Sequence, residues 1–184
     1  MIAIRRARAA DAPGIAAVHV ATWRNTYATL LPEAFLAGLS AERLALHYER
    51  AIRSGLGVFV AVRSGEQSVP LVVGFCTARR CVGESRLGES KLGEGEVETL
   101  YVADDWQNKG LGGQLLRAGA KYLAALGCRS VFIWVLHGNP AIFFYERLGG
   151  RRLANGTTHV AGSDVPQVAY AWDPIETLLD VDVR

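Results

Sequence analysis

The chain has 184 residues, of which 50% are hydrophobic and 21% are charged, as is usual for one soluble globular domain. Its formal net charge of +2 gives no general attraction to nucleic acids, and no apolar run approaches the roughly 20 residues of a transmembrane helix. The first residues lack the apolar core of a signal peptide, and the three cysteines include no C-x-x-C pair. We therefore expect a protein of the reducing cytoplasm, with neither a nucleic acid nor a membrane as partner.

The first half of the chain predicts one strand, three helices and a hairpin. Asp11 is placed to cap the first helix, with Pro13 in its first turn, and Ser40 to cap the third helix, which Gly55 ends. Two β-rich runs follow, joined by turn-forming residues at 63–66. The predicted elements are a strand at 2–8, helices beginning near residues 11, 32 and 40, and strands at 58–62 and 71–78.

Residues 79–95 form the one unusual stretch. They are rich in glycine, serine and charge and contain a near-repeat, E-S-R-L-G-E followed by E-S-K-L-G-E. Such a composition buries little apolar surface, so the stretch is predicted to be either a mobile loop or a loose hairpin extension.

The second half predicts a strand–helix–strand crossover and a closing hairpin. Residues 96–102 are rich in β-branched and aromatic residues, and further strands are predicted at 131–135, 150–157 and 165–172. The tail after Pro174 is acidic and is expected to fray. The helix is indicated by apolar residues at steps of three or four, namely Leu111, Leu115, Ala118, Tyr122 and Leu126.

These elements predict one domain over residues 1–184, with its core at about 2–173 and a tail at 174–184. Antiparallel strands followed by a crossover and a hairpin predict a mixed α/β sheet with helices on its faces. The crossover joins parallel strands and should be right-handed.

A glycine-rich string, Q-N-K-G-L-G-G at residues 107–113, stands where the strand gives way to the helix. Glycines let the backbone approach a ligand closely, and the free N–H groups at a helix N-terminus bind phosphate. No Walker string G-x-x-x-x-G-K-[ST] occurs, and the spacing of Gly110, Gly112 and Gly113 does not fit a Rossmann fingerprint. The string therefore predicts a phosphate site for a ligand other than ATP or a dinucleotide.

The pattern Q-x-x-G-x-G after a strand ending in Leu-Tyr-Val resembles the coenzyme A loop of the GNAT superfamily of N-acetyltransferases. Asn139-Pro140-Ala141, followed by F-Y-E-R-L-G at 144–149, is similar to that superfamily's second signature and comes about 30 residues later, as a crossover requires. Residues 4–12 resemble the first strand and first helix of that superfamily. W-R-N-T-Y at 23–27 with the Leu-Pro at 31–32, and V-A-Y-A-W at 168–172, resemble one branch of bacterial small-molecule acetyltransferases. The resemblance implies a GNAT-like sheet of about seven strands with helices on both faces, in which strands four and five splay apart.

The resemblance further implies acetyl-CoA as cosubstrate. In the family, main-chain groups of the fourth strand bind the pantetheine arm and the acetyl carbonyl, and the glycine loop binds the pyrophosphate. The alternative for this strand is an ordinary central strand. No metal is expected, because the four histidines show no ligand spacing. The expected coenzyme site comprises Leu100, Tyr101, Val102, Gln107, Asn108, Lys109, Gly110, Leu111, Gly112, Gly113, Asn139 and Tyr145.

Acetyl transfer needs a group that removes a proton from the attacking ammonium and one that reprotonates the departing thiolate. The pKa of an aliphatic amine is near 10.4 and that of the coenzyme A thiol should be about 8.5, so both proton transfers matter at pH 7. The resemblance assigns the acid to Tyr145 and the base to Glu96. Glu98 shares the strand face with Glu96 and lies nearer the loop. The structural alternatives are a half-buried core tyrosine and a solvated strand face. The catalytic candidates are Tyr145, Glu96 and Glu98, with water as a further proton acceptor.

Trp23, Tyr27 and Glu33 lie in the segment that walls the acceptor site in the family, where aromatic rings could hold an amine. Packing of the first two helices explains them almost as well. The expected function is acetyl transfer to a primary amine of a small molecule by direct attack in a ternary complex. An acyl-CoA-binding module without turnover and an enzyme acting on protein N-termini or lysines are the alternatives. The acceptor, the acyl-chain preference and the assembly, monomer or homodimer, stay open.

Overall fold

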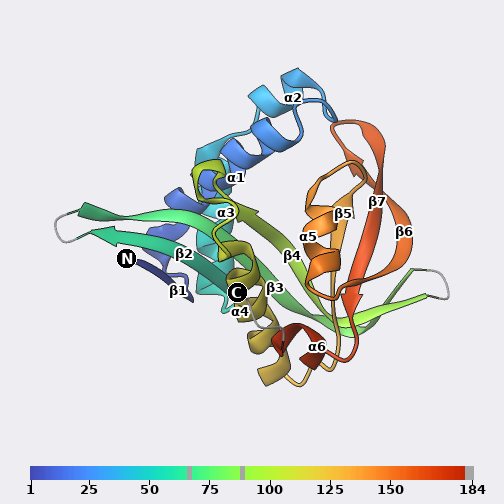
Figure 1. Ribbon diagram of the computed structural model, residues 1–184. Helices are drawn as coiled ribbons and strands as arrows, with labels where there is room; N and C mark the ends of the chain where they lie inside the picture. The colour runs from blue at the N-terminus through green and yellow to red at the C-terminus, as the bar shows by residue number, and fades with distance from the viewer. Residues whose placement is uncertain (66–67, 88–89, 181–184) are drawn as a thin grey trace.

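The computed structural model describes residues 1–65, 68–87 and 90–180, which form a seven-stranded mixed sheet with helices on both faces (Figure 1). The strand order is β1-β2-β3-β4-β5-β7-β6, in which β4 and β5 run parallel and the other neighbours antiparallel. The predicted fold class is confirmed. None of the described helices is long and apolar enough to cross a membrane.

The strands are β1 Ile2–Arg6, β2 Gly57–Gly65, β3 Ser68–Leu87, β4 Ser90–Val102, β5 Val131–Leu136, β6 Arg151–Val160 and β7 Ser163–Trp172. The helices are α1 Ala12–Thr26, α2 Glu33–Ala37, α3 Ala41–Arg53, α4 Leu111–Ala125, α5 Ala141–Arg147 and α6 Glu176–Leu179. Two short 3₁₀ turns are η1 Ala9–Asp11 and η2 Asp104–Trp106.

Two apolar cores lie on opposite faces of the sheet. In β2, Val58, Val60 and Val62 pack in the core beneath α1 and α3, whereas Ala61 points into the core beneath α4. Successive side chains of a strand alternate between faces, and here both faces are covered by helices (Figure 1). This explains why β2 reads as an unbroken apolar run instead of an alternating one.

The connection from β1 to α1 differs from the prediction. The strand ends at Arg6, not at residue 8, and Asp11 makes no side-chain cap to α1. Its carboxylate instead accepts from the Arg5 guanidinium and from the Arg8 backbone N–H, each at 2.7 Å. Asp11 therefore fixes the turn between strand and helix. The cap predicted for α3 is confirmed, because Ser40 Oγ accepts from the backbone N–H of Arg43, the third residue of that helix, at 3.2 Å.

The unusual stretch 79–95 continues two strands of the sheet. β3 runs through Leu87 and β4 begins at Ser90, while residues 88–89, and part of the earlier predicted turn at 63–66, lie outside the described residues. Of the two alternatives, the hairpin extension is the one found. This hairpin projects past β6 in Figure 1.

The tail packs on the domain as far as residue 180, so the prediction that it frays is wrong there. The Ile175 N–H donates to the Arg129 carbonyl at 2.8 Å, and α6 follows. Ile175 and Leu178 are buried in the core beneath α4. Burying side chains of this size contributes about 1.5–3 kcal/mol each, which offsets the ordering of a short tail.

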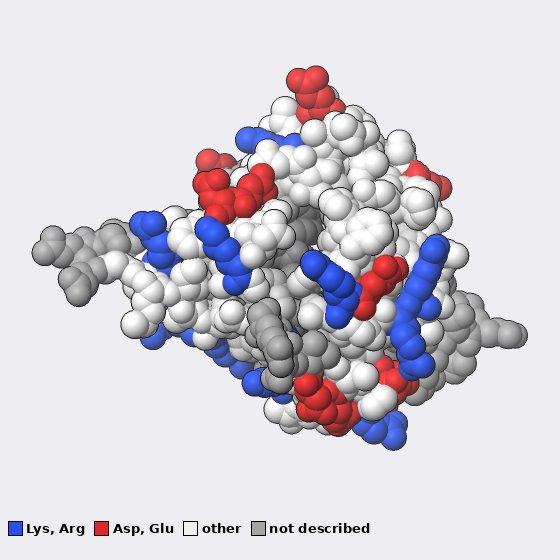
Figure 2. All heavy atoms as spheres, viewed as in Figure 1, with Lys and Arg blue, Asp and Glu red and all other residues white. Residues whose placement is uncertain are grey.

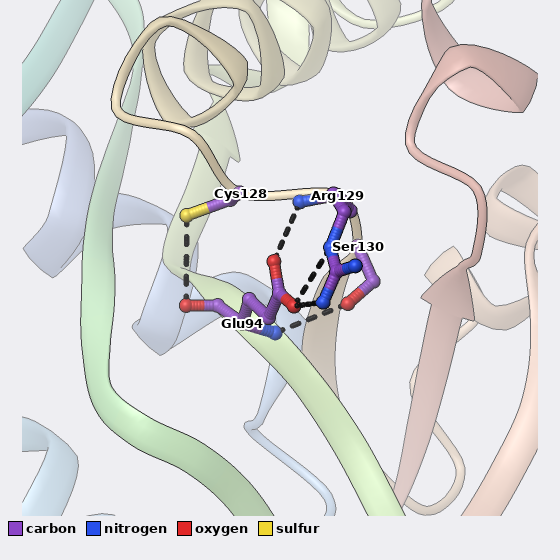
Figure 3. Close-up of polar contacts among 4 residues, drawn as sticks. All are labelled: Glu94, Cys128, Arg129 and Ser130. Atoms are coloured by element: carbon purple, nitrogen blue, oxygen red, sulfur yellow. Dashed lines mark hydrogen bonds and ion pairs between the residues drawn. The ribbon is translucent and has the colours of Figure 1, made fainter.

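The parallel pair β4–β5 is fastened at one end by a group of polar contacts (Figure 3). The Glu94 carboxylate accepts from the Arg129 backbone N–H at 2.8 Å and pairs with its guanidinium at 2.7 Å. The Ser130 hydroxyl accepts from the Glu94 N–H at 3.1 Å, and the Cys128 thiol lies 3.6 Å from the Glu94 carbonyl. These contacts hold the start of β5 against β4, whereas the opposite ends of the two strands are not joined in this way.

His19 of α1 is half-buried and faces α3 and β4. Its Nδ1 is 2.6 Å from the Tyr48 hydroxyl, and its ring centroid is 5.3 Å from those of Trp23 and Tyr101. Burial, together with the neighbouring charge of His47, lowers the pKa of His19 from 6.5 to about 4. The imidazole is therefore neutral in the folded protein at neutral pH.

The lowered pKa of His19 makes stability fall in acid. The unfolded chain binds the proton near pH 6.5 and the folded chain near 4, so the contribution is complete above 6.5 and is lost as the pH falls toward 4. Between pH 6.5 and 5 we expect wild type to lose about 2 kcal/mol of unfolding free energy from this group. Urea unfolding at both pH values should show this loss, and His19→Gln should remove most of it. The exposed His159→Gln variant is the control. Equal pH dependence in wild type and His19→Gln would contradict the assignment.

Candidate active site

A cavity of about 860 Å³ opens where β4 and β5 separate. The two strands pair over three residues each, Gly95–Val97 in β4 and Val131–Ile133 in β5, and their remaining lengths diverge. The predicted splaying is therefore present. Leu100, Tyr101 and Val102 line the cavity from one side and Trp134 and Val135 from the other. Main-chain groups on this edge of β4 are open to a ligand, because no β5 residue pairs with them.

The glycine string forms the floor of the cavity at the start of α4. Asn108 and Gly110 have positive φ angles of 57° and 75°, and Gly110 is the N-cap residue of α4 without a side-chain cap. The Gln107 side chain donates to the Val102 carbonyl at 3.2 Å and so ties the string to the end of β4. The backbone N–H groups at the start of α4 have no side-chain cap, and together with the helix dipole they suit an anion such as pyrophosphate.

Gly112 allows α5 to approach this string closely. A Cβ at Gly112 would lie 3.2 Å from the Phe144 ring, so a larger residue would push α5 away. Lys109 does not line the cavity: its Nζ donates to the Asp105 carbonyl at 2.7 Å and lies 4.7 Å from the Trp106 ring centroid. Of the predicted coenzyme residues, the others all line the cavity, and Lys109 is the one that the structure places outside it.

The start of α5 joins the cavity to α1. The Asn139 side-chain oxygen accepts from the Ala141 N–H at 2.9 Å, and Pro140 between them is the N-cap residue of α5. Its amide nitrogen donates to the Tyr27 hydroxyl at 3.0 Å. Asn139 thus fixes both the first turn of α5 and a wall residue contributed by α1.

Tyr145 lies one turn further along α5, buried and lining the cavity. Its ring packs 6.1 Å from Tyr170 and 6.2 Å from Trp172, centroid to centroid. Among the described residues its hydroxyl has no hydrogen-bond partner. Burial, and then the charges that Tyr101 and Tyr27 would carry when ionised, raise the pKa of Tyr145 above its usual 10.0. The hydroxyl therefore keeps its proton and is available to a ligand as a donor.

Glu96 and Glu98 converge on one arginine. Arg79 Nη2 lies 2.8 Å from Glu96 and its Nε 2.7 Å from Glu98. Thr77 faces Thr99 and Ala78 faces Val97, so Glu98 is an extra residue, a β-bulge, in β4.

The bulge separates the roles of the two carboxylates. Glu98 lines the cavity and Glu96 does not. Burial raises the pKa of Glu96, and the Glu98 charge adds to this against the opposing charge of Arg79. Glu98 is accordingly the better placed of the two to meet an amine.

One of the three predicted acceptor residues lines the cavity. Tyr27 does, whereas Trp23 packs on His19 and Tyr27 behind the wall, and Glu33 is exposed at the start of α2. Further residues that were not predicted from the sequence also line the cavity. Phe144 and Arg147 stand in the second signature string, and Thr22 has the helical spacing of the inner face of α1, so a signal existed for these three. The further residues include Thr22, Thr26, Trp134, Phe143, Phe144 and Arg147. No cluster of three or more metal-ligating side chains occurs among the described residues.

Comparison with known proteins gives a consistent result. The profile of the Acetyltransferase (GNAT) family matches residues 13–150. The chain is 32% identical over 178 residues to YuaI of Bacillus subtilis (strain 168), an uncharacterized N-acetyltransferase, covering 97% of this chain and 96% of that protein. Among solved structures, paia N-acetyltransferase of Thermoplasma acidophilum in complex with coenzyme A aligns with a TM-score of 0.65 at 19% identity, covering 94% and 99% of the two chains. Salmonella typhimurium yncA with its cofactor acetyl-CoA aligns with a TM-score of 0.66 at 21% identity, covering 100% and 97%.

Proposed function

The chain belongs to the GNAT family of acetyltransferases, and on this premise we propose that it transfers the acetyl group of acetyl-CoA to a primary amine of a small molecule by direct attack in a ternary complex. The main support for the proposal is that a single cavity is lined by the open edge of β4, by the uncapped start of α4 and by the side chain of Tyr145. Each feature alone has a structural explanation. Together they meet the needs of a thioester, a pyrophosphate and a leaving thiolate.

The proposed reaction uses groups that this cavity provides. The amine loses a proton to the Glu98 carboxylate, directly or through water, and its nitrogen lone pair attacks the acetyl carbon. The new C–N bond forms as the C–S bond breaks, and main-chain N–H groups of β4 stabilise the carbonyl oxygen. The thiolate takes a proton from the Tyr145 hydroxyl, the nitrogen of the new amide releases its second proton to water, and solvent restores the proton of Tyr145. The products are an amide and free coenzyme A.

The acceptor end of the cavity supports a small molecule over a peptide. Tyr27, Leu31 and Leu36 form an apolar cluster with Leu136, and Val160 of the β6–β7 hairpin packs on it. In Figure 1, α2 correspondingly approaches the tip of that hairpin. A chain segment entering between them would have to separate this cluster, whereas a small amine would not. Figure 2 shows a hollow near the centre of the face that Figure 1 also presents.

Initial rates measured while both substrates are varied test direct attack. With acetyl-CoA and a small amine varied independently, we expect reciprocal plots that intersect, since both substrates must be bound before transfer. Parallel lines would indicate a covalent acetyl-enzyme and would contradict the proposal. A lysine-containing peptide that is acetylated more efficiently than every small amine would contradict the acceptor class.

Coenzyme affinity should depend on the backbone at Gly110. Its φ of 75° costs an alanine roughly 1–2 kcal/mol, and relief of that strain would turn the N–H groups away from the phosphate. We expect Gly110→Ala to raise the Kd of coenzyme A about tenfold by calorimetry. Gly127→Ala is the matched control, because Gly127 has a φ of 86°, ends α4 and does not line the cavity. If both variants bind coenzyme A like wild type, the loop does not hold the phosphate.

A further inference from the structure

The charged residue in the acceptor half of the cavity is negative. We define this half by five of the lining residues, Thr22, Thr26, Tyr27, Glu98 and Trp134. Its α1 residues come from the helix that packs on the opposite face of the sheet from α4, whose start carries the glycine string. Glu98 is the carboxylic acid among these five, and none of them is basic. Two aromatic rings and two hydroxyl-bearing side chains complete the wall. An ammonium group therefore meets a carboxylate and aromatic faces there, which are the groups that attract it.

The basic side chains near the cavity are either ion-paired or lie away from its acceptor half. Arg79 pairs with both Glu96 and Glu98, so these three side chains together carry a charge of −1. Arg147 is the basic residue among the described cavity-lining residues. It lies one turn along α5 from Phe144, whose ring rests against the position of Gly112. Arg147 therefore belongs to the coenzyme half, where a phosphate would be its partner. Basic side chains lie on both sides of the hollow in Figure 2.

We propose that the acceptor site selects primary amines that carry no acidic group on the carbon next to the amino nitrogen, so that amines are acetylated and the corresponding α-amino acids are rejected. This inference rests on the proposed function. An α-carboxylate would lie within several ångströms of Glu98 in the acceptor half. Arg79, the cation that pairs with Glu98, does not line the cavity and is already shared by two carboxylates, so the group as a whole stays negative. Burying it there would leave it both desolvated and repelled.

The expected discrimination is large enough to measure. Two like charges about 6 Å apart, at the effective dielectric constant of about 20 that suits partly buried pairs, repel by an amount equivalent to about 100-fold in affinity. Solvent in the open cavity reduces this. We therefore expect each acid to be used at least about tenfold less efficiently than its uncharged counterpart.

Matched triplets of substrates separate charge from size. Each triplet contains an amine, the corresponding amino-acid amide and the amino acid: isobutylamine with valinamide and valine, 2-phenylethylamine with phenylalaninamide and phenylalanine, and agmatine with argininamide and arginine. Thiol release from acetyl-CoA gives kcat/KM for each compound, corrected for its fraction of unprotonated amine. The amine and the amide should both exceed the acid in every triplet that is used. The amide is as large as the acid, so a steric effect would reject both.

A positive charge introduced at Thr26 provides a second, independent test of the inference. Thr26 lines the acceptor half at the last residue of α1, where a lysine suits the helix dipole. Thr26→Lys should reduce the amide-to-acid ratio about tenfold, because the carboxylate then has a partner. Ala21→Lys adds the same charge to an exposed site on α1 that does not line the cavity, and it should leave the ratio unchanged.

The possible outcomes are distinct. Acids used as well as amides by wild type, or a ratio that Thr26→Lys leaves unchanged, would overturn the inference and leave the proposed function standing. If none of the compounds is acetylated although calorimetry shows coenzyme A binding, the proposed function fails, and the inference fails with it.

Discussion

Replacing Tyr145 by phenylalanine is expected to lower kcat by roughly 10²–10⁴-fold, the range for loss of a general acid, with little change in the Kd of coenzyme A. The substitution removes a hydroxyl that lines the cavity and, among the described residues, bonds no other group. Stability should therefore be unchanged. Thiol release, coenzyme titration and thermal melting on the one variant measure all three quantities.

Tyr170→Phe is the matched control for this experiment. Tyr170 packs beside Tyr145, but its hydroxyl donates to Glu146 at 2.8 Å and does not line the cavity. Its loss should cost about 1 kcal/mol of stability and leave kcat intact. A Tyr145→Phe enzyme that works at the wild-type rate would mean that the thiolate takes its proton from water, and the assignment of the acid would be wrong.

Replacing Glu98 by glutamine is expected to lower kcat by roughly 10²-fold, because the amide cannot accept the proton of the attacking ammonium. Water in the open cavity retains part of the function, so the loss should be smaller than for a fully enclosed base. The side chain keeps nearly the same shape, and the Kd of coenzyme A should not change. Initial rates at saturating acetyl-CoA across a range of pH measure the effect.

Glu96→Gln separates catalysis from the ion pair. Both glutamates pair with Arg79, so each variant loses one carboxylate from the same arginine, but Glu96 does not line the cavity. Glu96→Gln should therefore retain most of the wild-type kcat. Equal losses in the two variants would indicate that the carboxylates act by holding Arg79 and the bulge in place, and Glu98 would not be the base.

The features that could be predicted from the sequence depend on residues close together in the chain. The glycine string and the apolar steps along α4 each involve neighbours within about two helical turns. The strand–helix–strand order then restricts the topology to few arrangements. For this reason the fold class could be predicted from local patterns, whereas the splayed strands and the coenzyme residues were expected from the resemblance to the GNAT superfamily.

The features that could not be predicted depend on contacts between distant segments. The bulge at Glu98 arises from the register of β4 against β3, and this register puts Glu98, but not Glu96, at the cavity. The acceptor wall depends on a bond between Tyr27 and Asn139, which are 112 positions apart. Lys109 looked suited to pyrophosphate from its position in the string, but its charge is directed to the η2 turn. Local sequence patterns carry no information on such contacts.

Amine-dependent release of thiol from acetyl-CoA by the purified protein is the decisive test of acetyl transfer. We expect free coenzyme A and N-acetylated amine in equal amounts, by thiol assay and mass spectrometry, from at least one small primary amine, with release close to background when the amine is omitted. Binding of coenzyme A by calorimetry without any amine-dependent thiol release would contradict it, and the chain would then be an acyl-CoA-binding module.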